Sequence, residues 1–240
     1  MRTLAHALLC LVLAVPAWAA DRVDDSLYAG LLAAHVHAGV VDYAGLKAEE
    51  AKLDAYLAVL ERVNPADLDL ESRKAFYINA YNAWTLKLIL EHYPGITSIR
   101  DIGGLFKSPW KIAFVRLPGR VVTLDHIEHE VLRPRYQDPR VHMAINCASK
   151  GCPPLRAKPY AADRLDGQLD EAARGFVNDP RYVRLEGDTL SVSSIFDWFG
   201  GDFGGESGVL AFVRRYADGD RAGRLAALKS PPRIAYLDYD

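Results

Sequence analysis

The segment that most constrains the fold is a long apolar helix predicted between Ser72 and Tyr93. Ser72 is a suitable N-cap, and Pro94-Gly95 stops the helix. Apolar side chains cover nearly every face of it, namely Phe76, Ile78, Ala80, Trp84, Leu86, Leu88 and Leu90. Because a helix that is apolar all round lies inside its domain, we expect Asn79 and Asn82 to be hydrogen-bonded within the protein.

The rest of the chain alternates further helices with short strands. Helical spacing and capping residues predict helices over residues 27–37, 46–62, 124–133, 163–177 and 195–199, with Pro134 ending the third and a glycine-rich loop following the last. Turn residues predict strands over 112–117 and 121–123, a buried strand over 141–146 and a hairpin over 182–192 about Gly187. No repeat or low-complexity linker divides the chain. We therefore predict the α+β class, with one helix-rich domain over residues 20–240 around a small antiparallel sheet.

Residues 1–19 have the three parts of an export signal. Arg2 supplies the positive charge, Leu8 to Val15 form a short apolar run, and Ala17-x-Ala19 offers small residues for cleavage. A retained anchor would need roughly 20 continuous apolar residues, and Pro16 interrupts the run first. We expect an exported protein of the periplasm or the extracellular space, with no transmembrane segment after cleavage.

The charge pattern limits the classes of molecule that the protein can bind. The formal charge is −2, and Lys and Arg are scattered rather than clustered, which argues against a nucleic-acid partner. The sequence does not determine the oligomeric state.

Cleavage of the signal would leave two cysteines, Cys147 and Cys152, for which a disulfide is the default in an oxidising compartment. That bridge would close a small loop and add little stability, so the core must hold the fold together.

Cys147 is the strongest candidate nucleophile. It lies where the predicted buried strand ends and a turn rich in Ser, Gly and Pro begins, so that free backbone N–H groups can form an oxyanion hole. Cysteine catalysis also needs a base that produces the thiolate. The alternative interpretation is a buried or disulfide-bonded cysteine without chemistry.

The predicted helix after Thr123 carries the candidate base, His129. Asp125 and His126 lie one helical turn before it, so an acid can orient one ring nitrogen while the other faces a thiol. A solvated polar face is the alternative. His142 is a competing base, but on a strand its side chain would point away from that of Cys147.

No cofactor and no metal are expected. His126, His129, His142, Cys147 and Cys152 are acceptable zinc ligands, but their spacings match no usual zinc motif. Serine-nucleophile, phosphate-loop and dinucleotide motifs are also missing from the sequence.

Six segments together resemble the family called domain of unknown function 547. They are FYINAYNAWTL (76–86), SIRDI (98–102), TLDHIEH (123–129), RVHMAINCAS (140–149), GCPPL (151–155) and SIFDWF (194–199). The resemblance implies a fold similar to papain-like and transglutaminase-like thiol hydrolases, with the histidine preceding the cysteine. It also implies a triad of Cys147, His129 and Glu128, and a structural or redox-protective part for Cys152.

Two functions follow as hypotheses. The first is a cysteine-dependent hydrolase or acyl transferase that acts on a small peptide-like or thiol-peptide amide. In it Cys147 attacks, His129 moves the proton and Glu128 orients His129. Neighbours on a helix point about 100° apart, so Asp125 is the alternative orienting acid. The second is a non-catalytic envelope binding or scaffold domain with a Cys147–Cys152 disulfide.

The export signal gives a direct prediction. The mature protein should begin at Ala20 or Asp21, because cleavage is expected after Ala19 or one residue later. Mass spectrometry of the exported protein measures this, and retention of Met1 would contradict the prediction.

Overall fold

The computed structural model describes residues 23–103 and 107–239, so the predicted signal segment lies outside the described residues. The helices are α1 (Ser26–His35), α2 (Tyr43–Ala48), α3 (Glu50–Leu60), α4 (Leu70–Leu90), α5 (Leu124–His126), α6 (Arg133–Tyr136), α7 (Leu165–Asn178), α8 (Ile195–Trp198), α9 (Gly200–Phe203), α10 (Gly205–Tyr216) and α11 (Gly219–Ala227). Short 3-10 helices span Pro65–Asp67, Ile99–Asp101, Pro109–Lys111, Pro139–Met143 and Ala162–Arg164. A π-helical segment, Ile127–Leu132, joins α5 to α6.

The described strands form three small sheets. Strands β1 (Val36–His37) and β2 (Val40–Val41) pair antiparallel, as do β3 (Val115–Leu117) and β4 (Arg120–Val122). Strand β6 (Thr189–Ser193) pairs antiparallel with β5 (Val183–Glu186) and parallel with β7 (Arg233–Leu237). The predicted α+β class is confirmed. The strands do not form one antiparallel sheet, since the described residues hold three small sheets and one of them contains a parallel pair. The chain returns from β6 to β7 through a helical connection, because parallel neighbours need a crossover.

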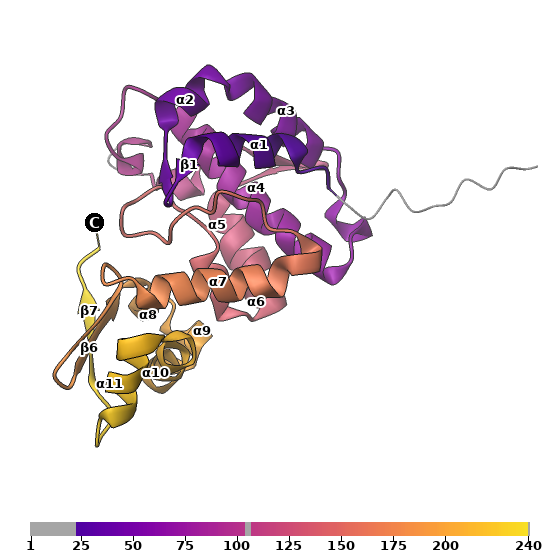
Figure 1. Cartoon of the computed structure of the whole chain (residues 1–240). Coiled ribbons are helices and arrows are strands. Elements are labelled where there is room, and N and C mark those ends of the chain that lie inside the picture. The colour runs from indigo at the N-terminus through magenta and orange to yellow at the C-terminus, as the bar shows by residue number, and fades with distance from the viewer. Residues whose placement is uncertain (1–22, 104–106, 240) are drawn as a thin grey trace, which may run out of the picture.

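Two clusters of buried apolar residues pack on either side of α7. The larger gathers residues of α1 to α4 with Leu165 and Leu169, and the smaller gathers residues of β5, β6 and α10 with Phe176. Figure 1 shows α7 running between these two groups of elements. Within the described residues no helix combines the length and apolar character needed to cross a membrane.

Helix α4 is the buried helix that the sequence predicts. It begins at Leu70 rather than Ser72, because the Asp69 side chain accepts a hydrogen bond from the backbone N–H of Ser72 and caps the first turn. Its buried polar residues are paired. Asn79 donates to Tyr160 O and accepts from Tyr160 N, both at 2.9 Å. Asn82 donates to Ala144 O at 2.9 Å and accepts from Asn146 N at 2.8 Å.

The predicted strand over 141–146 is wrong. Residues 139–143 form a 3-10 helix whose first turn is capped by the Asp138 side chain, which accepts from Arg140 N at 3.0 Å. The Lys74 ammonium of α4 also contacts Asp138, at 2.6 Å. Burial raises the pKa of Asp138, but the hydrogen bonds from Arg140 and Lys74 outweigh it and hold the pKa at about 2. A short apolar run is equally typical of a buried strand and of a buried helical turn, so the sequence pattern does not distinguish the two structures here.

Other boundaries differ for local reasons. The helix predicted over 46–62 divides at Glu49 into α2 and α3. The helical path continues through Pro134 to Tyr136, because the turn before it is π-helical and already departs from the α-type hydrogen-bond ladder that proline interrupts. The predicted glycine-rich loop is instead α9 and the start of α10, whose apolar face is buried. The hairpin about Gly187 is confirmed.

Replacing Asn82 with Leu should destabilise the fold by about 1–3 kcal/mol, because it leaves the buried Ala144 O and the partly buried Asn146 N without their partners. The free energy of unfolding in urea measures this. Glu71→Gln, at an exposed position on the same helix, should stay within about 0.5 kcal/mol of the parent. An Asn82→Leu protein as stable as the parent would contradict the argument.

Candidate functional site

A cavity of about 250 Å³ opens between the two groups of elements. Helix α4, the helix from α5 to α6, the loop after Met143, helix α8 and the C-terminal segment all contribute to its wall. The lining residues are Tyr81, Arg100, Ser108, Trp110, Asp125, Glu128, His129, His142, Ile145, Cys147, Pro153, Ile195, Trp198, Phe199 and Tyr239.

The three residues predicted as catalytic, Cys147, His129 and Glu128, all line this cavity. So do Asp125, the alternative acid, and His142, the competing base. His126 does not line it. In the described part of the chain, no group of three or more His, Cys, Asp or Glu side chains is arranged to hold a metal ion.

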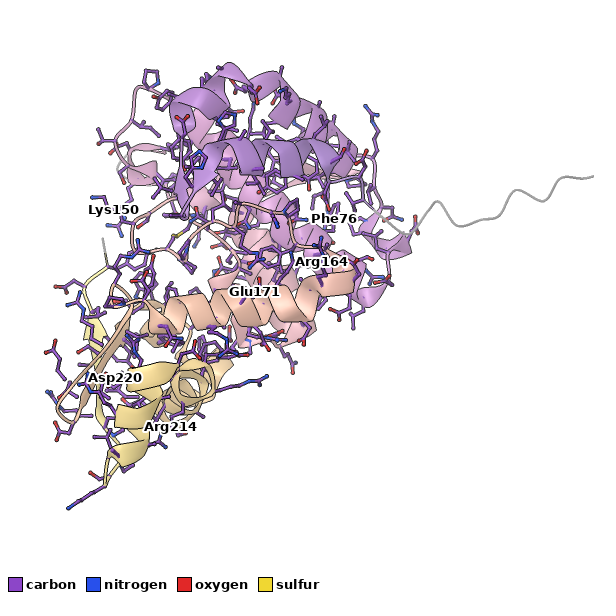
Figure 2. All side chains as sticks on the ribbon, viewed as in Figure 1. Phe76, Lys150, Arg164, Glu171, Arg214 and Asp220 are labelled. Atoms are coloured by element: carbon purple, nitrogen blue, oxygen red, sulfur yellow. A yellow bond between two sulfur atoms is a disulfide. The ribbon has the colours of Figure 1, made fainter. Side chains whose placement is uncertain are left out.

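Cys147 is joined to Cys152 by a disulfide. The cysteines lie on the loop that also carries Lys150, which Figure 2 labels at the side of the molecule where the two groups of elements meet. Asn146 holds this loop in shape, since its side chain accepts from Ala148 N at 3.0 Å and donates to Pro153 O at 2.8 Å. Ala148 takes a left-handed backbone conformation, with φ of 57°.

The backbone N–H groups of Cys147 and of the next residue, Ala148, already have acceptors. The N–H of Cys147 points to Cys152 Sγ at 3.1 Å, and the N–H of Ala148 points to Asn146 Oδ1. These two N–H groups are therefore not open as an oxyanion hole in the disulfide form. Only the Cys147 N–H would be released if Cys152 moved away.

His129 faces Asp125, one turn earlier, rather than its neighbour Glu128. The distance from His129 Nε2 to Asp125 Oδ1 is 3.6 Å. Arg133 approaches the other nitrogen, Nδ1, at 2.6 Å. Because a guanidinium only donates, Nδ1 must accept, and the ring proton sits on Nε2, toward Asp125.

Glu128 has a different set of partners. Tyr81 on α4 donates a hydrogen bond to Glu128 Oε2 at 3.4 Å, and Nδ1 of His142 lies 3.8 Å from Oε1. The carboxyl is nearly enclosed, and burial raises the pKa of Glu128 to about 7. A group with such a pKa can both hold and release a proton near neutral pH.

His142 is fixed by Asp202, a residue that the sequence did not single out. The ring is 1% exposed, stacks on Phe199 with centroids 4.1 Å apart, and places Nε2 2.8 Å from Asp202 Oδ2. Burial lowers the pKa of His142 to about 4, so the contact is a hydrogen bond from a neutral ring. The expectation that the side chains of His142 and Cys147 point to opposite sides is wrong, because both line the cavity and the His142 segment is a 3-10 helix rather than a strand.

Arg133 connects the two histidines. It donates to both carboxylate oxygens of Asp202, at 2.6 and 3.0 Å, and also reaches His129. Its hydrogen bond is the main reason that the pKa of Asp202 is lowered. Arg133 and Asp202 are 69 residues apart, and sequence patterns carry no signal for such a pairing.

Residues 65–177 match the model of a family described as "Protein of unknown function, DUF547". The family resemblance indicated by the sequence motifs is thus supported over this segment. The segment includes Glu128, His129, Cys147 and Cys152, whereas Asp202 and Tyr239 lie beyond it. No curated protein and no solved structure matches the chain.

The DUF547 segment supplies the polar side chains of the cavity together with Tyr81 and Trp110, and residues beyond it add further aromatic walls. Trp198 is 53% exposed and packs against Tyr239 with ring centroids 4.6 Å apart. Trp110, within the DUF547 segment, presents an indole N–H that is buried without a partner among the described residues. Aromatic walls beside a disulfide and ionisable groups suit a ligand with both apolar and polar parts.

Replacing Glu128 with Gln should change how stability depends on pH. The folded protein holds the Glu128 proton more tightly than the unfolded chain, so its stability falls as pH rises from about 4.5 to about 7. Gln has no proton to lose. The variant should therefore gain roughly 2–3 kcal/mol relative to the parent between about pH 4.5 and pH 8.

Urea unfolding at the two pH values measures this gain. Glu130→Gln is the matched control, because Glu130 is an exposed acid on the same helix. Its stability relative to the parent should not depend on pH in this way. A constant difference between Glu128→Gln and the parent at both pH values would show that the Glu128 carboxyl is not desolvated.

Proposed function

We propose that the protein is a cysteine-dependent hydrolase or acyl transferase acting on small peptide-like or thiol-peptide amides. One observation carries this proposal: Cys147 and His129, from separate segments, line the same cavity, and an acid faces the histidine. The proposed relationship to papain-like and transglutaminase-like enzymes rests on the family motifs that contain the two residues.

In the proposed reaction the Cys147 thiolate attacks the carbonyl carbon and His129 carries the proton to the leaving amine. Asp125 faces His129, so it takes the orienting role first assigned to Glu128. For His129 to take a proton at Nδ1, the Arg133 side chain must leave that nitrogen and keep only its hydrogen bonds to Asp202. Glu128, with His142 beside it, is left as a second acid in the same cavity.

The proposed activity requires the thiol form of Cys147. An external dithiol would supply two electrons and two protons, so that Cys147 and Cys152 become thiols while the dithiol becomes a disulfide. In the oxidising space outside the cytoplasm, which the export signal implies, the disulfide would protect the nucleophile. Cys152 would then be the protective partner.

A second candidate function is a non-catalytic envelope binding or scaffold domain. The disulfide favours it, since a bridged cysteine is not a nucleophile. In this case the aromatic cavity would bind a ligand without changing it.

Labelling with iodoacetamide separates the two functions. In a Cys152→Ser protein, labelling of Cys147 should stay fast well below pH 7, because an imidazolium neighbour holds the thiolate. His129→Ala should shift the labelling profile to higher pH, toward an ordinary thiol pKa of about 8.5. The rate of mass increase at Cys147, followed across pH, measures the shift.

His126→Ala is the matched control, because His126 lies on the same helix but does not line the cavity. It should leave the profile unchanged. If His129→Ala also leaves it unchanged, the thiol-hydrolase proposal fails and the binding domain replaces it.

A further inference from the structure

Tyr239 reaches the cavity from the end of strand β7. The parallel pairing of β7 with β6 runs to Leu237, whose carbonyl accepts a hydrogen bond from the Ser194 hydroxyl at 2.5 Å. Two residues later the Tyr239 ring packs on Trp198. The pairing of β7 thus delivers a phenol to the loop that carries Cys147.

The Tyr239 hydroxyl lies 3.0 Å from Cys147 Sγ and 3.1 Å from Cys152 Sγ. Disulfide sulfurs carry no hydrogen, so the hydroxyl is the donor. Burial raises the pKa of Tyr239, against the opposing effect of a hydrogen bond from Ser149. The phenol therefore keeps its proton at neutral pH and is a permanent hydrogen-bond donor beside the sulfur.

Cys152 Sγ marks the position that a reacting group would take. It is the atom bonded to Cys147 Sγ, as the acyl carbon would be in the proposed reaction. Two donors converge on it from 3.1 Å, namely the Cys147 N–H and the Tyr239 hydroxyl. An oxygen on that carbon would lie about one bond further out, within reach of both donors, which is the arrangement of an oxyanion hole.

We propose that Tyr239 is a further catalytic residue, whose hydroxyl forms the oxyanion hole together with the backbone N–H of Cys147. The inference rests on the proposed function. It adds a side-chain donor where Ala148 N–H is already occupied by Asn146.

The proposed step balances without further reactants. The Cys147 thiolate forms the S–C bond, and the carbonyl π electrons move to the oxygen, which accepts hydrogen bonds from Tyr239 and Cys147 N. When the carbonyl re-forms, the bond to the leaving group breaks and the leaving group departs with a proton from His129. The acyl group stays on Cys147 as a thioester, which water or an amine then cleaves.

The test compares two reactions of Cys147 in the Cys152→Ser protein. Alkylation by iodoacetamide forms no oxyanion, whereas acetylation by p-nitrophenyl acetate does. Both rates are taken on the plateau where the thiol is fully ionised, so that a changed thiol pKa does not enter. Nitrophenolate release and the mass of acetyl-Cys147 report acetylation.

Tyr239→Phe should slow acetylation by about 10- to 100-fold and change alkylation by less than about threefold, since only acetylation uses the donor. Tyr236→Phe is the matched control, a partly exposed tyrosine on β7, and should change neither rate. Equal acetylation by Tyr239→Phe and the parent overturns the inference. A parallel loss in both rates also overturns it, because it indicates a packing role.

Failure of the proposed function gives a different result. In that case Cys147 in the Cys152→Ser protein labels like an ordinary thiol whether or not His129 is present. The Tyr239 inference then falls with it. Normal His129-dependent labelling with no effect of Tyr239→Phe on acetylation overturns the inference alone.

Discussion

The two hydrogen bonds made by the Asn82 side chain are the interaction on which the site depends. Asn82 lies inside a helix that is apolar on nearly every face, so its amide must find partners in the protein. It finds them in the backbone of Ala144 and Asn146, immediately before Cys147. The same buried helix also supplies Tyr81 to Glu128. The helix that organises the core therefore also sets the position of the reactive loop.

Burial makes some ionisable groups of the cavity neutral, whereas ion pairing keeps others charged. Glu128 and His142 are desolvated and favour their neutral forms, whereas Asp202 keeps its charge through Arg133. In the series Arg133, Asp202, His142 and Glu128, the first two groups are thus charged and the last two are neutral. Only one full ion pair has to be held in a partly buried place, which limits the desolvation cost of the site.

The disulfide has two consequences for the same cavity. It removes the Cys147 sulfur from chemistry, and it places Cys152 Sγ where the Cys147 N–H and Tyr239 hydroxyl converge. The donors therefore remain ordered around the sulfur pair in the oxidised protein. Opening the bridge would leave these two donors beside a free thiol, which connects the proposed protection of the nucleophile with its proposed activation.

The sequence alone determined which segments are buried and where the chain turns. Full apolar coverage predicted α4 and its bonded asparagines, and glycine and proline placed the β3–β4 and β5–β6 hairpins, because burial and turn formation are local preferences. The β1–β2 hairpin was missed, since residues 36 and 37 were predicted to extend the helix that forms α1. The same local rules could not choose between a strand and a 3-10 helix at residues 139–143. Helix geometry left Asp125 as the alternative to Glu128 beside His129, and the structure selects it. Only the tertiary structure decided that His142 and Arg133 both meet Asp202. Such pairs depend on the packing of distant segments, and a local pattern encodes how deeply a residue is buried but not which residue it meets.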